Sequence, residues 1–254
     1  MKTLFKLIIV ALIVNFLTGC KHDVFDIDTS NVKLDPIVFK RLDKDVFSLT
    51  PENCNQKMIE FHKKYSTFYN RYTSSIVNNG GKVDSLYSQT LLRFIDNKDI
   101  KTTYNDVLKT FTDNDVELLG DEMTEVVKRF KVFFPKRKIP NQYVAFVSGF
   151  QYNVVYVDST IAIGLDMYLG NNNMFYNMME LPKFRTRTMN KEHVLSDAVR
   201  GWIITEFDNA NPVNNLLNQF EGTYVLNDGV NYLKIVFLKK TMEYTGSCYQ
   251  GLLI

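Results

Sequence analysis

The spacing of apolar residues changes part-way along this chain, and that change limits the folds it can adopt. Between residues 51 and 131, apolar side chains recur at three- and four-residue steps, the period of an amphipathic helix. Between residues 143 and 163, short runs rich in Val, Ile and Tyr are separated by turn residues, which is typical of β-strands. Helical spacing returns at residue 191. This order predicts an α+β fold with a helical N-terminal half, a small central sheet and further helices.

Turn and capping residues divide these regions into separate elements. The predicted helices cover residues 51–72, 83–96, 98–111, 114–131 and 191–207. The predicted strands cover the first half of residues 37–47 and then residues 143–147, 153–157 and 160–163. Residues 171–190 are polar and aromatic and include Pro182, which indicates a long irregular connection. After residue 207 we expect a helix over residues 211–220 and a strand-like or helical run over residues 232–238.

The sequence also predicts which residues cap these helices and which side chains face the core. Thr50 is suited to cap the first helix, and Asp113 or Asn114 is suited to cap the fourth. Aromatic side chains at helical spacing in the first helix should lie in the core; they are Phe61, Tyr65, Phe68 and Tyr72. The last helix should pack one stripe against the strands, formed by Val194, Leu195, Ala198, Trp202 and Ile203.

Composition excludes several classes of protein. Hydrophobic residues make up 45% of the chain and charged residues 23%, which excludes a disordered chain, a coiled coil and a collagen-like repeat. The formal net charge is +2, and both Lys2 and Lys6 lie in the first 19 residues, which contain no Asp or Glu. The remaining chain therefore has no net formal charge, and nothing in it favours nucleic acid as a partner.

The N-terminus has the proportions of a secretory signal. Lys2 and Lys6 precede an apolar core over residues 7–17, which is too short to span a bilayer as a stable helix. The segment ends in Leu-Thr-Gly and then Cys20, and this order resembles a bacterial lipobox. By that resemblance residues 1–19 are a signal peptide, Cys20 is lipidated, residues 20–36 are a tether, and residues 37–254 form a single α+β domain. The alternative is an ordinary signal followed by a chance cysteine.

Two further cysteines follow Cys20 in the sequence. Cys54 and Cys248 could form one disulfide that closes a very long loop, or they could stay as two unpaired buried thiols. No CxxC pair is present, so the sequence shows neither a zinc knuckle nor a redox motif.

Three segments, in this order after the lipobox, resemble one known family. The first is residues 39–47, FKRLDKDVF; the second combines FFP at 133–135, IP at 139–140 and VSGFQY at 147–152; the third is GLDMYLG at 164–170. They resemble the GldB-type gliding-motility lipoproteins of the Bacteroidetes. The resemblance is strongest over residues 37–207 and thins afterwards, although Tyr244, Thr245 and Gln250 echo a later motif. Family members usually continue for several more helices, which implies a shortened member or a truncated reading frame.

The resemblance implies a cell-envelope lipoprotein without enzymatic activity. It would be anchored in a membrane through its N-terminal lipid and would contact other envelope proteins of the motility and protein-export apparatus. The family resemblance also implies a distant similarity to zincin-like metallopeptidases, in a degenerate form. The helix over residues 191–207 would then occupy the place of the zincin active-site helix.

The zincin motif H-E-x-x-H is absent from this chain. Its nearest substitute is His193 with Asp197, which share a helix face, but Val194 stands where the general base should be. We therefore expect a structural histidine at the start of the helix, paired with Asp197, and no metal and no cofactor. His62 is expected at the surface, and His22 belongs to the tether.

Carboxylates offer a second possible chemistry. Asp43 and Asp45 could act as an acid–base pair, but capping or solvation of their segment is the expectation. Asp166 is flanked by apolar residues, so it should be at least partly buried and should need partners, with a structural ion pair favoured over a ligand site. The candidate partners are Arg185, Arg187 and Arg200.

A Met- and aromatic-rich stretch in the connection is a candidate interaction surface, because methionine-rich surfaces adapt to partners. Its residues are Met174, Phe175, Tyr176, Met178 and Met179. No phosphate-binding loop, serine elbow or Cys–His signature appears, so no catalytic residue and no small-molecule substrate is predicted. The sequence favours a non-enzymatic envelope lipoprotein. The alternatives are a degenerate zinc-dependent hydrolase and a glycan-binding surface lipoprotein.

Overall fold

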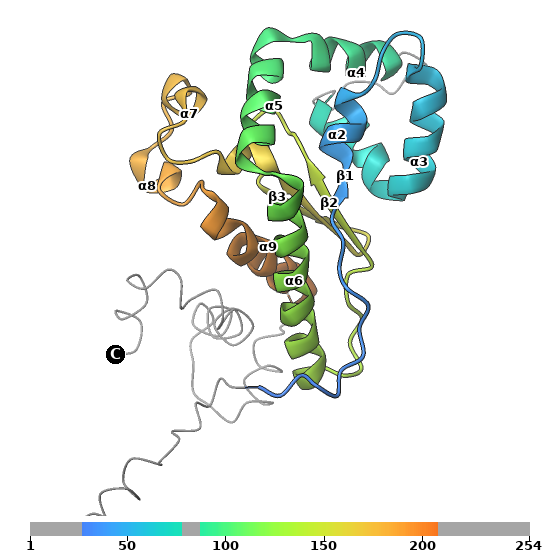
Figure 1. Ribbon diagram of the computed structural model, residues 1–254, viewed down its shortest axis with the longest axis vertical. Helices are drawn as coiled ribbons and strands as arrows, with labels where there is room; N and C mark the ends of the chain where they lie inside the picture. Colours follow the sequence, from blue (N-terminus) through green and yellow to red (C-terminus); the bar gives the residue numbers. More distant parts are fainter. Residues whose placement is uncertain (1–26, 78–86, 208–254) are drawn as a thin grey trace, which may run out of the picture.

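A four-stranded mixed sheet lies at the centre of the computed structural model, which describes residues 27–77 and 87–207 (Figure 1). The strand order is β1-β2-β4-β3. The strands are β1 (Lys40–Arg41), β2 (Gln142–Phe146), β3 (Val154–Val157) and β4 (Thr160–Gly164). β1, β2 and β4 run parallel to one another, and β3 is antiparallel to β4.

Helices surround this sheet, so the predicted α+β fold is confirmed. They are α2 (Leu42–Phe47), α3 (Cys54–Arg71), α4 (Tyr87–Asp96), α5 (Lys98–Thr110), α6 (Asp113–Phe133), α7 (Met174–Met178), α8 (Lys183–Thr186) and α9 (Lys191–Phe207). A π-helical turn, η1 (Tyr72–Val77), extends α3, and a 3-10 turn, η2 (Leu165–Tyr168), follows β4.

Alternating side chains of the strands divide the core into two clusters, one on each face of the sheet. Val144 and Phe146 of β2 pack with α2, α3 and α4, where the ring centroids of Phe68 and Phe146 are 5.4 Å apart. Tyr143 and Ala145 of the same strand pack with α6 and α9 on the other face. The sheet is therefore covered on both sides, as the burial of β2 and β4 requires.

The predicted strands after residue 142 and the inward face of α9 are confirmed. The five residues of the predicted α9 stripe are all buried, and the helix contacts β3 and β4. The aromatic residues predicted for the core of α3 are buried as well. The elements expected over residues 211–220 and 232–238 lie outside the described residues.

One helix was not predicted and one prediction of local structure is wrong. The segment after β1 forms the short helix α2, which was not predicted because six residues are too few to show a helical period. The connection over residues 171–190 is also more regular than expected, because it contains α7 and α8.

Capping residues fit the ends of the long helices. Thr50 Oγ accepts the Asn53 N–H at 3.4 Å, and Asn53 Oδ1 accepts the Thr50 N–H at 2.8 Å, so Thr50 closes the turn before α3. The N-cap of α3 itself is Asn53, so the expected cap at Thr50 is wrong by three residues. At α6 the cap is Thr112, in a reciprocal capping box with Asp115, and the expected cap at Asp113 or Asn114 is wrong by one or two residues.

Buried tyrosines predict instability at high pH. Burial raises the pKa of Tyr65, Tyr72 and Tyr168, and burial together with Asp43 raises the pKa of Tyr104 to about 12. Folded protein then retains phenolic protons that the unfolded chain loses above about pH 10. The contribution of these tyrosines to stability should therefore be constant below that pH, and stability should fall as the pH rises from 10 towards 12. Denaturant titrations across this range, followed by tyrosinate absorbance, should show ionisation coupled to unfolding. Ionisation of all tyrosines near pH 10 without unfolding would contradict this prediction.

Candidate functional site

The three parallel strands end at one edge of the sheet, and a polar residue follows each of them. Asp43 comes after β1, Ser148 after β2 and Asp166 after β4, and all three are fully buried. The carboxyl edge of parallel strands is the usual place for a functional site in such sheets. This edge therefore holds the first candidate site, and each of the three sequence motifs contributes one of these residues.

Asp166 is bound by donors from the loop after β2. Its Oδ1 accepts the Ser148 N–H at 2.9 Å, its Oδ2 accepts the Phe150 N–H at 2.6 Å, and the Ser148 hydroxyl lies 3.0 Å from Oδ2. Burial raises the pKa of Asp166, and these donors oppose that rise. The predicted burial of Asp166 is confirmed. The predicted arginine partners are wrong, because Arg185, Arg187 and Arg200 are exposed and the partners are backbone and hydroxyl groups.

The backbone conformation of the second and third motifs allows the loop after β2 to contact Asp166. Gly149 and Phe150 have positive φ angles of 69° and 64°, which turn the loop so that its N–H groups face the carboxylate. In β4, a Cβ at Gly164 would collide with the Tyr152 carbonyl oxygen. The glycines of the two motifs thus allow a close approach between the loop and the end of β4.

The same edge holds α7 in place. The Tyr176 hydroxyl donates to the Asp166 carbonyl oxygen at 2.8 Å and accepts the Leu169 N–H at 3.0 Å. Phe150 packs against the rings of Phe175 and Tyr176, with centroid distances of 5.3 and 5.8 Å. The two motifs therefore act as a support for α7 and the residues that follow it.

The outer side of this supported segment is the second candidate site. We call it the α7–α8 surface, and it consists of Met174, Met178, Met179, Lys183, Phe184, Arg185 and Arg187. Of the predicted interaction residues, Met174, Met178 and Met179 are exposed, whereas Phe175 and Tyr176 are buried. Phe184, 75% exposed, was not predicted. Partner binding by this stretch of five residues stays a prediction.

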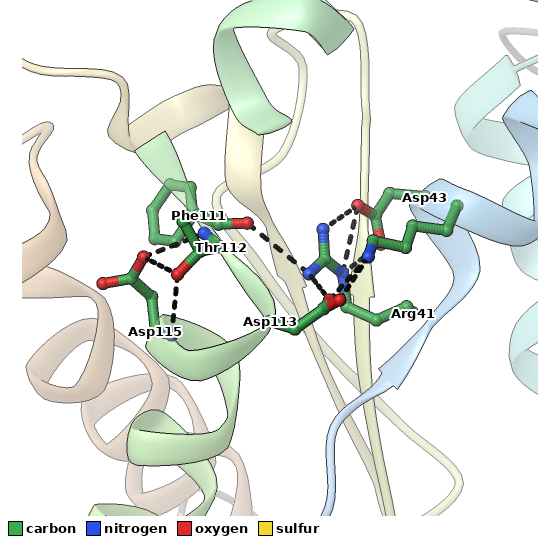
Figure 2. Close-up of polar contacts among 7 residues, drawn as sticks. Arg41, Asp43, Phe111, Thr112, Asp113 and Asp115 are labelled. Atoms are coloured by element: carbon green, nitrogen blue, oxygen red, sulfur yellow. Dashed lines mark hydrogen bonds and ion pairs between the residues drawn. The ribbon is translucent and has the colours of Figure 1, made fainter. Parts of the chain in front are cut away.

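A second polar cluster includes Asp43 of the carboxyl edge and joins β1 to the start of α6 (Figure 2). Arg41 forms an ion pair with buried Asp43 at 2.6 Å and a second with Asp113 at 3.0 Å. Lys44 also reaches Asp113 at 2.6 Å. Burial raises the pKa of Asp43, and the neighbouring Arg41 opposes that rise. Arg41 was not singled out from the sequence, although it lies within the first motif.

The expectation that Asp43 and Asp45 cap or solvate their segment is wrong for Asp43. Its carboxylate is buried in the ion pair with Arg41. Asp45 is partly exposed, where it accepts the Tyr65 hydroxyl at 2.6 Å and pairs with Lys64 at 2.7 Å. The two carboxylates thus have separate partners and are not arranged as an acid–base pair.

Comparison with known proteins agrees with these motifs. The family model described as gliding motility protein GldB matches residues 22–228. The chain belongs to the GldB family. No curated protein and no solved structure gives a significant match. The match extends beyond residue 207, where the resemblance of the motifs thins, and it includes the carboxyl edge and the α7–α8 surface.

Two of the three histidines of this GldB-family chain, His62 and His193, lie in the described residues, and His22 lies outside them. His193 Nδ1 lies 2.6 Å from Asn190 Oδ1, while Asp197 accepts the Tyr168 hydroxyl at 3.0 Å. His62 is exposed on α3, as expected. Within residues 27–77 and 87–207, no group of three His, Cys, Asp or Glu side chains could hold a metal ion.

One of the three cysteines, Cys54, lies in the described residues. Among the described residues Cys54 is buried and free, and Cys248 lies outside them. Residues 1–19 and Cys20 also lie outside them. In the parts that the structure describes, none of the helices has the length and apolar character needed to cross a bilayer.

Proposed function

We propose that this protein is a non-enzymatic, lipid-anchored component of the cell envelope that acts in gliding motility. The family match over residues 22–228 is the observation that carries the proposal. The order of Lys2, Lys6, the apolar core and Cys20 supports an acyl anchor at Cys20. In this proposal residues 20–36 are the tether and residues 37–254 are the single domain.

A structural role of the carboxyl edge supports the absence of catalysis. Asp43, Ser148 and Asp166 are fully buried, and each has intramolecular partners that occupy its polar atoms. A substrate would have to displace Arg41 or the loop after β2 to reach them. In α9, Val194 is buried at the position where a zincin needs its glutamate. These residues hold the fold together, and the proposed activity is interaction with envelope proteins of the motility and protein-export apparatus.

The anchor is tested by Cys20→Ser in the full chain. We expect the variant to fold normally and to leave the membrane fraction, because anchoring resides in the acyl chains and the mature chain has no net formal charge. The variant should be exported behind a signal sequence that is removed independently of Cys20, so that the apolar segment cannot act as an anchor. Fractionation and fatty-acid labelling measure the result, with Lys21→Ser as the neighbouring control. A variant that stays in the membrane pellet after a high-salt wash would contradict the prediction.

The partner part of the proposal needs a separate measurement. The intact lipoprotein should be cross-linked in its native envelope and purified, and we expect proteins of the motility or export apparatus to be enriched. Recovery of the protein alone, under conditions that retain known envelope complexes, would count against a role in that apparatus.

A further inference from the structure

We propose that the α7–α8 surface contacts the anionic phospholipid surface of the membrane to which the protein is anchored. The inference rests on the proposed anchor only in that the anchor keeps the domain near a membrane. The inference concerns a different part of the chain from the anchor. The α7–α8 surface combines exposed apolar and basic side chains, and we assign anionic lipid as its partner.

The apolar part of the surface is large for so short a segment. Met174 and Met178 are 56% and 66% exposed and are four residues apart, so they share the outer face of α7. Phe184 in α8 is 75% exposed, more than the other large apolar residues of the described chain. Exposed large apolar side chains on one short stretch of chain are a candidate contact with a protein or a membrane.

Basic residues surround Phe184 and point to an anionic partner. Lys183 and Arg185 are its direct neighbours, Arg187 follows, and all three are exposed. Over residues 171–191 the sequence has four basic residues and one acidic residue, although the chain after residue 19 is electrically balanced. Aromatic and apolar side chains flanked by Lys and Arg are typical of segments that lie at a membrane interface.

The shape of this region favours a lipid surface over a protein groove. Figure 1 shows α7 and α8 projecting from the side of the molecule, away from α3 and α4. Phe175 and Tyr176 fix the inner side of α7 to the carboxyl edge, so the outer side chains are presented by a supported segment. A projecting segment with basic and apolar side chains can enter the headgroup region of a bilayer without a matching cavity.

The proposed anchor would make even a weak contact effective. Ile27 and Leu34 of the proposed tether pack against the core, so the span that separates Cys20 from the packed chain runs from residue 20 to residue 27, at most about 25 Å when fully extended. A tethered domain meets the membrane at a high effective concentration, so a contact that is weak in solution becomes well populated. The contact would then set the orientation of the domain on the membrane.

The test uses the mature chain, residues 20–254, with Cys20→Ser, so that no acyl chain contributes to binding. Sedimentation with vesicles of phosphatidylcholine alone, or with about 30% phosphatidylglycerol, measures the partition. The test variant combines Phe184→Ser, Arg185→Gln and Arg187→Gln. The matched control combines Ile59→Ser, Lys63→Gln and Arg71→Gln, which replaces one exposed apolar and two exposed basic residues on α3. Thermal melts establish that both variants remain folded.

We expect the parent chain and the α3 control to bind the anionic vesicles, to bind neutral vesicles less, and to dissociate as salt is added. The test variant should bind the anionic vesicles on the order of tenfold or more weakly. No binding of the parent chain, or equal losses in the two variants, would overturn the proposal. Unchanged vesicle binding together with loss of cross-linked proteins in the envelope would also overturn it, and would assign the surface to a protein partner. Since every chain in this test carries Cys20→Ser, failure of this test is distinct from failure of lipidation.

Discussion

Trp202→Ala is expected to lower the free energy of unfolding by about 3–5 kcal/mol. Trp202 is fully buried in α9, and its ring centroid lies 4.5 Å from that of Phe130 in α6. Truncation would leave a cavity where α9 meets α6 and the sheet, and close-packed neighbours could fill it only in part. Within the described residues the indole N–H has no hydrogen-bond partner, so the loss arises from packing and not from a broken hydrogen bond.

Denaturant titration of the Cys20→Ser chain measures this effect, and two variants serve as controls. Phe184→Ala removes an exposed aromatic side chain and should change stability little. His193→Ala should lower stability by at most about 1 kcal/mol, since the imidazole bonds to Asn190 at the start of the helix. A large loss on adding a chelator, reproduced by His193→Ala and restored by zinc, would contradict a structural α9 and would revive the metal site.

Asp166→Ala is expected to have the second large effect, a loss of about 2–6 kcal/mol, because each buried donor left unpaired costs about 1–3 kcal/mol. The substitution removes the acceptor of the Ser148 and Phe150 N–H groups. Asp121→Ala, an exposed carboxylate on α6, is the matched control and should change stability little. Denaturant titrations of the two variants give the comparison.

A second measurement follows from the position of Asp166 beneath α7. If the loop after β2 loosens, Phe150 no longer supports Phe175 and Tyr176. Trypsin should then cut the Asp166→Ala variant faster at Lys183, Arg185 and Arg187, under conditions where the Asp121→Ala variant is cut slowly. Equal stability and equal cleavage in the two variants would mean that the cluster does not support the fold, and a ligand role for Asp166 would be favoured instead.

The sequence predicted those elements whose signals are local. The three strands after residue 142 and the buried stripe of α9 follow from the spacing of apolar residues alone. The start of α6 was placed less well because Thr112, Asp113, Asn114 and Asp115 can all accept hydrogen bonds, and only the reciprocal bond with Asp115 selects Thr112.

The candidate site was less predictable because its contacts join distant segments. The donors to Asp166 are mostly backbone N–H groups, which every loop carries and which leave no mark in the sequence. Phe175 and Tyr176 were expected at the surface because the short helix α7 was not predicted. The turn of this helix places both of them inward, and Met174 and Met178 are exposed. The family resemblance identified the segments over residues 147–152 and 164–170, but it could not show that the two segments bind each other.

The parallel pairing of β1 with β2 also determines when this chain can fold. Lys40 pairs with Val144 and Arg41 with Ala145, so β1 must wait for a partner that lies far along the polypeptide. All of α2 to α6 lies between them, and the core on one face needs Phe146 as well as Phe68. Such non-local topology folds slowly, because the entropy cost of closing the long loop comes before the stabilising contacts form. A chain delivered across a membrane from its N-terminus would therefore stay incompletely packed until β2 and β4 had emerged, which is when chaperones and proteases would have access to it.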